Sequence, residues 1–582
     1  MPYDSNCHLR WFSSRRAAQW LLVITGRLVR FGRVTAVPEP DQAFPVLTDA
    51  QMERLRALAE LEDVTAGDVL YSAGDPTYDF VFVESGEVEI IRAATLGSPE
   101  QVIVPHGAGR FLGELNMLTG QAVYLTARVS QDGQVRRVSP ERFRRFMSED
   151  TELSDVVLRA FMARREILLT GEGARSVQLL GSRSSAEALA LRTWAARQQL
   201  PHLWIEVETP EGDRLLSDLE ADIQDLPLAV TPTAVLRRAT SGTLAENLGL
   251  AYRAVAGRQF DLVVVGGGPA GLAAAVYGAS EGLDTVVFDE MAAGGQAAAS
   301  ARIENYLGFP SGLAGAELAS LAIVQAEKFG ARITSPCKAA ALEVVDGQLV
   351  VTLDDGTEVP TRAMIVASGA HYRSLGIERW TEFEGAGIHY SATDLEARAC
   401  SGADVVVVGG ANSAGQASLS LAGRGGKVRL VIRGPDLFGG MSRYLADRIL
   451  ADPNIEVRTA TEVVALGGGS SLDTVTLADR TTGHHREVPC QGLFCFIGAV
   501  PASEWLDGVA LDTNGFVLTD HDVPAGSAEA FTLLGRQPLP FETSVPGVFA
   551  AGDVRHGSMK RVASAVGEGA SAVRSVHRAI GT

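Results

Sequence analysis

The segment FDLVVVGGGPAGLAAA, residues 260–275, decides the fold of the C-terminal half of the chain. Its apolar start, Leu262–Val265, has the length of a buried strand, and an alanine-rich stretch with helical character, Leu272–Glu281, follows. The glycines between them are spaced as GxGxxG. A turn of this spacing that joins a strand to a helix is the fingerprint of a dinucleotide-binding βαβ unit, which we therefore predict here.

Each glycine of this turn has a separate role. Gly266 permits the tight turn, Gly268 lets a pyrophosphate approach the backbone, and Gly271 lets the helix pack closely on the strand. The next predicted strand, Thr285–Phe288, ends at Asp289, whose carboxylate is placed to accept hydrogen bonds from ribose hydroxyls. The alternative is a glycine-rich loop with only a structural role, which the strand, the helix and the terminal acid disfavour.

Further segments in the same order strengthen this interpretation: GGQ at 294–296, ENYLGFP at 304–310, ASGA at 367–370 and VFAAGDV at 548–554. Together they resemble the flavin-contacting segments of the low-molecular-weight thioredoxin reductases, and the resemblance covers residues 260–582. It implies bound FAD, with Asp553 on the ribityl chain and a helix from Arg561 facing the flavin pyrimidine edge. The implied FAD-binding residues are Gly266, Gly268, Pro269, Ala270, Gly271, Asp289, Gly294, Gly295, Gln296, Asn305, Ala367, Gly369, Gly552, Asp553, Arg561, Val562 and Ala563.

A second apolar strand, Asp404–Val408, leads into GGANSAGQ at 409–416, which resembles the NADPH loop of the same family except that Ala411 replaces the middle glycine. The next predicted strand ends at Arg433 with no acid to bind a ribose 2′-hydroxyl, which favours NADPH over NADH. A site that keeps the fold without binding a cofactor remains the alternative. The implied NAD(P)H-binding residues are Gly409, Ala411, Asn412, Ser413, Ala414, Arg433 and Arg443.

The dithiol that this family carries is missing. In GIHYSATD, residues 387–394, Ser391 and Asp394 stand where the resemblance places the two cysteines of Cys-Ala-Thr-Cys. Both are candidate catalytic residues. For Asp394 there are two interpretations: it tunes the flavin or donates a proton, or it is a loop carboxylate that is only solvated. A hydroxyl forms no disulfide, so the conventional route to thioredoxin is closed. The five cysteines, none in a CxxC pair, are Cys7, Cys337, Cys400, Cys490 and Cys495.

Closely spaced short strands over residues 67–91, followed by GELNMLTG at 113–120, resemble a cyclic-nucleotide-binding β-roll. Gly113, Glu114 and Leu115 match the start of its phosphate cassette, where the resemblance implies that the glutamate binds a ribose hydroxyl. Val123 stands where the family carries its phosphate-binding arginine, and a valine offers no charge. A nucleotide-like ligand and a ligand-free interaction domain both remain open.

Residues 175–250 faintly resemble a thioredoxin or glutaredoxin fold. The loop after its first strand, residues 181–185, contains no cysteine, and Thr231-Pro232 is a candidate for the cis-proline turn of that fold. If this interpretation is right, a second redox element has lost its sulfur and serves for docking or structure.

Composition sets the remaining limits. The chain has 582 residues and a formal net charge of −19, so several domains are expected and nucleic-acid binding is disfavoured. No apolar run is long enough to span a membrane, and scattered cysteines fit a cytoplasmic location. The basic N-terminus is predicted to be a poorly ordered extension, although Arg15-Arg16 before an apolar run also allows a twin-arginine signal.

The fold class that we predict is multidomain α/β. The expected domains are a basic extension (1–40), a β-roll (41–170), a small thioredoxin-like unit (175–250), an FAD-binding Rossmann-type domain (258–372 and 500–582) and an NAD(P)H-binding one (373–499). The expected function is an FAD-dependent NAD(P)H oxidoreductase, a homodimer by resemblance, that passes electrons to an unknown non-dithiol acceptor. A non-catalytic flavin or ligand sensor, and a disulfide reductase that uses cysteines from a partner, are the alternatives.

Overall fold

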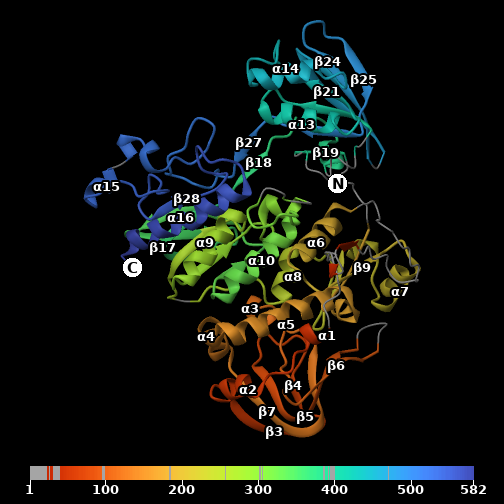
Figure 1. Ribbon diagram of the computed structural model, residues 1–582, viewed down its shortest axis with the longest axis vertical. Coiled ribbons are helices and arrows are strands. Elements are labelled where there is room, and N and C mark those ends of the chain that lie inside the picture. The colour runs from red at the N-terminus through yellow and green to blue at the C-terminus, as the bar shows by residue number, and fades with distance from the viewer. Residues whose placement is uncertain are drawn as a thin grey trace, which may run out of the picture.

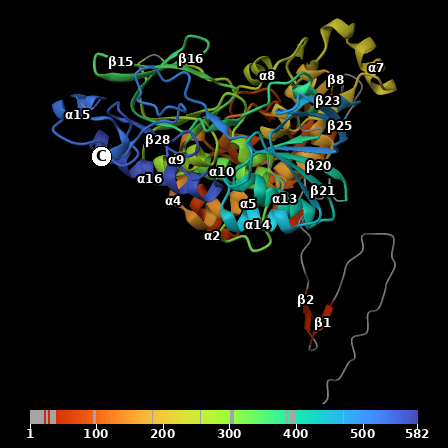
Figure 2. The same cartoon turned by 90° about the horizontal axis from the view of Figure 1, so that it is seen from above.

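The computed structural model describes residues 22–24, 27–29, 40–94, 99–182, 185–255, 257–300, 303, 306–384, 387–390, 392, 400, 402–469, 471–527 and 529–581. Figure 1 shows an antiparallel β-roll at one end of the molecule and the second dinucleotide fold at the other, with the first dinucleotide fold between them and a small α/β unit at its side. Within the predicted extension, β1 (Leu22–Ile24) and β2 (Arg27–Val29) pair as a hairpin that projects from the body in Figure 2.

The β-roll is a sheet of order β3-β7-β5-β6, with β4 also paired to β7. Thr48 and Gln51 form a capping box at the start of α2, and a helical pattern continues in the sequence to Leu61, but the helix ends at Arg56. Residues from Glu60 instead pair with β7, so a long-range ladder overrides the local pattern. The strands are β3 (Glu60–Val64), β4 (Val69–Tyr71), β5 (Phe80–Arg92), β6 (Gln101–Gly107) and β7 (Thr126–Val138); the helices are α1 (Pro40–Ala43), α2 (Asp49–Arg56), α3 (Asn116–Thr119), α4 (Pro140–Glu149) and α5 (Thr151–Thr170).

The small α/β unit is a four-stranded sheet of order β11-β10-β8-β9, in which only β8 and β9 are parallel. The cis-proline prediction is wrong in position: the cis bond is Leu226–Pro227, directly before β10, and Thr231–Pro232 is not cis. The elements are β8 (Gln178–Gly181), α6 (Ala186–Arg197), β9 (Leu203–Glu206), α7 (Pro210–Asp218), β10 (Leu228–Val230), β11 (Val235–Leu236) and α8 (Ser241–Asn247), with short 3-10 turns η1 (Glu172–Ser176) and η2 (Ile223–Asp225).

The first dinucleotide fold has the strand order β14-β13-β12-β17-β16-β15, and β28 adds to β17. Since β12, β17 and β28 are parallel, their carboxyl ends share one edge of the sheet. The elements are β12 (Phe260–Val265), α9 (Pro269–Ser280), β13 (Thr285–Phe288), η3 (Gly295–Ala299), α10 (Gly315–Lys328), β14 (Arg332–Thr334), β15 (Ala339–Val345), β16 (Gln348–Leu353), β17 (Glu358–Val366), η4 (Asp520–Asp522), η5 (Ala525–Ser527), α15 (Glu529–Leu533), β28 (Val548–Ala550) and α16 (Val562–Ile580).

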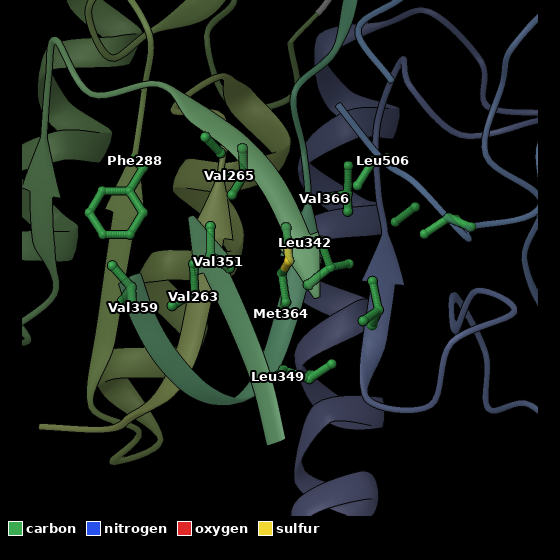
Figure 3. Packing of buried hydrophobic residues seen from close by; sticks show 14 of the residues in the cluster. Val263, Val265, Phe288, Leu342, Leu349, Val351, Val359, Met364, Val366 and Leu506 are labelled. Atoms are coloured by element: carbon green, nitrogen blue, oxygen red, sulfur yellow. The ribbon is translucent and has the colours of Figure 1, made fainter. Parts of the chain in front are cut away.

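Apolar side chains fill both faces of this sheet. On one face, Val263, Val351 and Met364 pack together with Leu506 from the C-terminal segment, as Figure 3 shows. On the other face α9 and α16 cover the strands, and glycine permits their contact: a Cβ at Gly569 would lie 2.0 Å from the Ala270 carbonyl oxygen. Burial on both faces explains the continuous apolar runs of β12 and β13, whose positions the sequence predicted.

The second dinucleotide fold is a parallel sheet of order β19-β26-β20-β21-β22, with the antiparallel sheet β23-β24-β25 beside it and the ribbon β18-β27 joining it to the first fold. Among the described helices, none is both long and apolar enough to cross a membrane. The elements are β18 (Ala370–Tyr372), α11 (Trp380–Phe383), β19 (Ile388–His389), β20 (Asp404–Val408), α13 (Asn412–Ala422), β21 (Lys427–Val431), α14 (Arg443–Ala451), β22 (Ile455–Arg458), β23 (Thr461–Gly468), β24 (Leu472–Asp479), β25 (His485–Pro489), β26 (Gly492–Cys495) and β27 (Ala499–Pro501).

Candidate functional site

The turn between β12 and α9 has the geometry that its glycines predict. Gly266 has φ +105°, and a Cβ there would lie 2.3 Å from the carbonyl oxygen of Ala367. A Cβ at Gly271 would lie 1.8 Å from the Gly266 carbonyl oxygen, so any larger residue would push the helix off the strand. Gly268 differs, because the nearest atom to a Cβ there is 3.9 Å away. The lack of a side chain at Gly268 therefore leaves a space that no other part of the protein fills.

Asp289 lies at the end of β13, beside this turn. Its carboxylate accepts a hydrogen bond from the Gly267 N–H at 2.7 Å and another from the Met291 N–H at 3.0 Å. Burial raises the pKa of Asp289, and the backbone donors partly oppose that shift. The sequence thus places the acid correctly, at the point where it meets the backbone of the phosphate turn.

The C-terminal segment closes the same edge of the sheet. Residues after β28 turn at Gly552, whose N–H donates to the Glu568 carboxylate at 2.8 Å. Arg555 also donates to Glu568, at 3.1 and 3.0 Å, so one buried carboxylate of α16 fixes the segment that carries Asp553. Burial raises the pKa of Asp553, with Lys560 opposing the shift. The α16 helix begins at Val562, with Arg561 as its N-cap residue.

A cavity of about 190 Å³ lies where these segments meet. Most of the predicted FAD residues line it: Gly268, Pro269, Ala270, Gly295, Gln296, Ala367, Gly369, Gly552, Asp553, Arg561 and Val562. Gly266, Gly271 and Asp289 support it from the turn, Gly294 lines a neighbouring cavity, and Ala563 follows in the first turn of α16. Asn305 lies outside the described residues.

Six further residues line this cavity that are not among the predicted FAD-binding residues: Ala297, Ser300, Ala370, Tyr372, Lys560 and Ala565. Lys560 donates to the Asp553 carbonyl oxygen at 3.1 Å, and Gln296 donates to that of Ala370. An elongated dinucleotide fits this arrangement. The open space at Gly268, the N-terminus of α9 and the cavity beyond it would hold pyrophosphate and flavin in that order.

The second turn, between β20 and α13, is similar but tighter. Gly409 has φ +145°, and a Cβ there would lie 2.5 Å from the Phe496 carbonyl oxygen. Ala411 is the N-cap residue of α13 with an extended backbone, φ −103° and ψ 175°, so alanine is accepted without strain. Asn412 accepts a hydrogen bond from the Ser442 N–H at 2.8 Å, which fixes the following loop above the turn. Ser413 and Ala414 continue the first turn of α13.

Basic side chains surround the end of β21. Arg433 and Arg443 are both exposed, the first just beyond the strand and the second at the start of α14. The sequence missed a third: Arg480 follows β24 and donates to the Arg433 carbonyl oxygen at 3.3 Å. Because 47 residues separate the two arginines, no local motif joins them. Arg480 therefore adds a third arginine to the two, Arg433 and Arg443, that the sequence predicted.

The positions of the missing cysteines, Ser391 and Asp394, lie outside the described residues. The described cysteines are all buried. Burial raises the pKa of Cys490 to about 12 and of Cys495 to about 11, so neither is a thiolate near neutral pH. The prediction that these two are core thiols agrees with their places in the apolar cluster around β26.

An aromatic pair borders the cavity of about 190 Å³. Tyr372 lines the cavity, is 45% exposed and stacks on Tyr390, with ring centroids 5.1 Å apart and planes 9° apart. The Tyr390 hydroxyl donates to Glu384 at 2.5 Å and accepts from the Trp380 indole at 2.9 Å. The residue before Ser391 is thus fixed against the rim of the cavity.

The β-roll holds the three predicted cassette residues together. Gly113 turns with φ +120°, and Leu115 is buried at the start of α3. Both carboxylate oxygens of Glu114 accept hydrogen bonds from Arg165 of α5, so the side chain that would bind a ribose is already paired. The sequence did not indicate this arginine.

Residues 260–569 match the family described as pyridine nucleotide-disulphide oxidoreductase. The chain belongs to this family. Residues 61–150 match the cyclic nucleotide-binding domain, which confirms the predicted combination of modules. As a member of this family the protein is a flavin-dependent NAD(P)H oxidoreductase of the thioredoxin-reductase type.

Individual relatives are similar to this chain over about half of its length. The thioredoxin reductase of Treponema pallidum (strain Nichols) is 33% identical over 329 residues, which are 56% of this chain and 98% of that protein. The NADH dehydrogenase of Bacillus subtilis (strain 168) is 31% identical over 314 residues, which are 54% of this chain and 57% of that protein. Among solved structures, T. acidophilum thioredoxin reductase has 30% identity and a TM-score of 0.43, and covers 55% of this chain and 98% of its own.

Proposed function

We propose that this oxidoreductase binds FAD and NADPH and passes electrons to a small acceptor that is not a dithiol. One observation carries the proposal: the cavity at the carboxyl ends of β12, β17 and β28 is bordered by a stacked tyrosine pair. FAD, when bound, supplies the hydride and electron chemistry, and the protein supplies position and electrostatics.

The residues around the cavity have roles that follow from their places. Gly268 and the N-terminus of α9 would hold the pyrophosphate, and Asp289 would bind the adenosine ribose. Asp553, fixed by Lys560 and the Glu568 network, would bind the ribityl chain. The N-terminus of α16 would place a positive dipole end at the flavin pyrimidine edge.

For the nicotinamide cofactor, Arg433 and Arg480 support NADPH over NADH. Two guanidinium groups beside the end of β21 offer the charge and the donor geometry that a 2′-phosphate needs, and no acid follows that strand to bind a 2′-hydroxyl. Ala411 leaves the turn intact, which weighs against the alternative of a cofactor-free second site.

The nature of the acceptor follows from what surrounds the flavin cavity. Ser391 and Asp394 cannot form a disulfide, and the thiols of Cys337, Cys490 and Cys495 are buried with raised pKa values. The half-exposed ring of Tyr372 instead offers a flat surface on which a planar acceptor such as a quinone would stack. Ser391 and Asp394, which stand at the positions of the family's cysteines, are therefore proposed to act on the acceptor, with Asp394 as a proton donor.

An anaerobic titration tests this proposal. Purified full-length protein reconstituted with FAD should lose its absorbance near 450 nm on addition of about one equivalent of NADPH, and a soluble quinone should restore it. A flavin that stays oxidised would favour the alternative of a non-catalytic sensor. Turnover of thioredoxin or dithionitrobenzoate by the isolated chain would favour disulfide reduction with cysteines from elsewhere.

The homodimer remains a prediction. An apolar cavity of about 350 Å³ between α9 and α10 supports it, since exposed Tyr277 and Leu321 lie at its edge. Light scattering on the reconstituted protein would decide between a monomer and a dimer. The predicted cytoplasmic location and domain boundaries likewise remain predictions.

A further inference from the structure

The β-roll contains a cavity of about 60 Å³ beneath β5 and β6. Its walls are mostly apolar and come from strands and from the long helix α5. They include Ile90, Ile103, Val104, Leu125, Ile167 and Leu168. Its volume is about a third of the 190 Å³ of the cavity proposed for the flavin, so it suits a small molecule.

A cyclic nucleotide does not suit this cavity. Val123 is buried in its wall where the family carries a phosphate-binding arginine. Glu114, the ribose ligand that the resemblance implies, has Arg165 on both carboxylate oxygens, and its Oε2 also accepts from the Asn116 N–H at 3.1 Å. Releasing this carboxylate to a sugar hydroxyl would leave Arg165, of which 3% of the side chain is exposed, without its partner.

A different cation faces the cavity. Arg164 is 6% exposed and donates to three carbonyl oxygens, those of Ala43 at 2.8 Å, Gly113 at 2.6 Å and Phe111 at 3.0 Å. A guanidinium has five N–H donors, so two remain after these three bonds. No ion pair of Arg164 occurs within the described part of the chain, and the nearby Glu114 charge is committed to Arg165. Buried charges are usually paired with a charge of opposite sign. The buried Arg164 guanidinium, in contrast, has no counter-ion among the described residues.

A second polar group points to a ligand. His106 of β6 lines the same cavity, is 1% exposed, and its Nδ1 has no hydrogen-bond partner. Burial, together with the charges of Arg164 and Arg110, holds the pKa of His106 well below its usual range, so the ring is neutral. A neutral imidazole offers one donor and one acceptor, and an unsatisfied buried nitrogen costs free energy unless a ligand or water meets it.

We infer that this cavity binds a short-chain organic carboxylate in place of a cyclic nucleotide. Its carboxylate would accept hydrogen bonds from Arg164 and from the His106 ring, and its short apolar chain would lie against Ile90, Val104 and Leu168. The Tyr78 hydroxyl donates to Asn116 at 2.8 Å and accepts from the Glu114 N–H at 3.1 Å. Its hydrogen bonds are therefore already made, and the anion would be bound by Arg164 and His106.

The position of the site gives the ligand a route to the rest of the molecule. Arg164 and Arg165 are consecutive residues of α5, the first facing the cavity and the second facing the junction with the small α/β unit. A ligand that shifts α5 at Arg164 therefore acts on Arg165 and on the Gln199 carbonyl that it holds at 3.0 Å. This inference concerns a site separate from the flavin cavity and does not depend on the proposed function.

Calorimetric titration of the full-length protein with butyrate tests the inference. We expect one saturable site per chain. Butyramide, which has the same shape without the charge, should bind at least about tenfold more weakly, because it loses a charge-assisted hydrogen bond. Val104→Trp should fill the cavity and weaken butyrate binding at least about tenfold. Val102→Trp, 44% exposed on the same strand, is the matched control and should bind as the wild type does.

Several outcomes would overturn the inference. They are no saturable binding at millimolar butyrate, equal binding of butyramide, unchanged binding by Val104→Trp, or displacement of butyrate by cyclic AMP, the last of which would restore the nucleotide site. Flavin absorbance and circular dichroism verify that each variant is folded. If Val104→Trp does not fold, His106→Phe removes the ring nitrogens at similar volume and should also weaken butyrate binding.

Discussion

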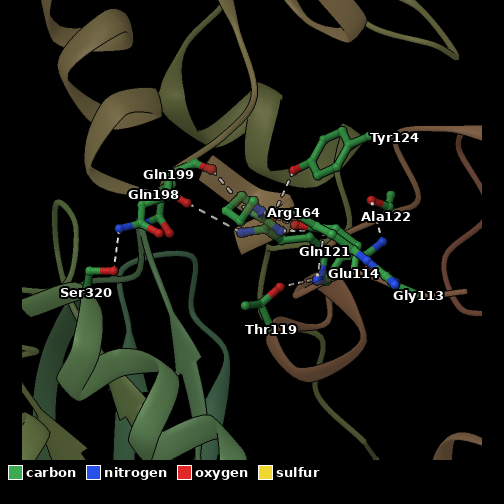
Figure 4. A network of polar contacts seen from close by, with 12 residues as sticks. Gly113, Glu114, Thr119, Gln121, Ala122, Tyr124, Arg164, Gln198, Gln199 and Ser320 are labelled. Carbon is green, nitrogen blue, oxygen red and sulfur yellow. Dashed lines mark hydrogen bonds and ion pairs between the residues drawn. The ribbon is translucent and has the colours of Figure 1, made fainter. Parts of the chain in front are cut away.

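Arg165 and Glu114 form a buried ion pair at the junction of three modules, with the Arg165 Nη2 donating to the Glu114 Oε2 at 2.8 Å. The same guanidinium donates to the Gln121 Oε1 and to the Gln199 carbonyl oxygen, both at 3.0 Å. Gln199 in turn donates to Ser320 of the first dinucleotide fold (Figure 4). One arginine of the β-roll thus connects its cassette to the small α/β unit, and through it to α10.

Arg165→Met should destabilise this junction strongly. Breaking a buried pair leaves an uncompensated carboxylate and costs about 3–5 kcal/mol. The midpoint of the first urea unfolding transition, followed by circular dichroism, should fall accordingly. Arg142→Met is the matched control, since its partner Glu60 is 83% exposed and such pairs contribute about 0–1 kcal/mol. Equal midpoints for the two variants would contradict the prediction.

Glu327 of α10 should make stability depend on pH. It is 7% exposed, its Oε2 has no hydrogen-bond partner, and burial raises its pKa to about 8, with Arg165 opposing the shift. A carboxyl with a raised folded-state pKa holds a proton that the unfolded chain releases, so stability falls as the pH rises from about 4.5 to 8 and is level above that. Glu327→Gln should remove this fall. Urea midpoints at pH 5 and pH 8, compared between wild type and variant, test it; parallel changes would count against it.

The strands and turns of the site could be predicted from the sequence because they depend on residues that are neighbours in the chain. The apolar runs of β13 and β20 occur at the predicted residues, and the glycines at 266, 268 and 271 follow a spacing that is recognised within a single turn. The contribution of Asp553 came from resemblance, since nothing near Asp553 indicates that β28 joins β17.

Contacts between side chains that are far apart in the sequence could not be predicted in this way. Arg480 reaches Arg433 from 47 residues away, and Tyr372 stacks on Tyr390 across the end of the connecting ribbon. Arg165 lies 51 residues from Glu114, and in the sequence nothing distinguishes it from the other basic residues of its helix. Helical and strand periodicity report which face is buried, but not which polar side chains meet.

Gly268→Ala should separate flavin binding from folding. Its backbone, φ −74° and ψ −175°, suits any residue, and no protein atom lies within 3.9 Å of the added methyl group, which would occupy the proposed pyrophosphate position. The variant should fold with an unchanged urea midpoint but bind FAD at least about tenfold more weakly, as measured by flavin fluorescence. Gly271→Ala, whose methyl group would meet the Gly266 carbonyl oxygen at 1.8 Å, should instead lower stability. Full flavin affinity in Gly268→Ala would refute the assignment.

Tyr372→Leu should impair reduction of a planar acceptor selectively. The half-exposed ring is proposed to stack on the acceptor, and stacking contributes about 0.5–1.5 kcal/mol beyond buried area. The kcat/KM for a soluble quinone should therefore fall about three- to tenfold, while the rate of flavin reduction by NADPH in stopped-flow measurements stays the same. Tyr372→Phe, which keeps the ring, should behave as the wild type. A loss in both variants, or in flavin reduction, would show that the ring does not bind the acceptor.

Arg433→Ala and Arg480→Ala should each lower the preference for NADPH. The Arg480 Nη1 donates to the Arg433 carbonyl oxygen at 3.3 Å, so the Arg480 guanidinium lies beside the backbone of Arg433, just beyond the end of β21. A charge-assisted hydrogen bond to a phosphate contributes about 1.5–3 kcal/mol, so KM for NADPH should rise about tenfold or more in each variant. KM for NADH, which lacks the phosphate, should stay constant. Arg486→Ala, at an exposed position of β25, is the control for general loss of positive charge. A parallel rise in KM for both cofactors would mean that the arginines support the fold and do not bind the 2′-phosphate.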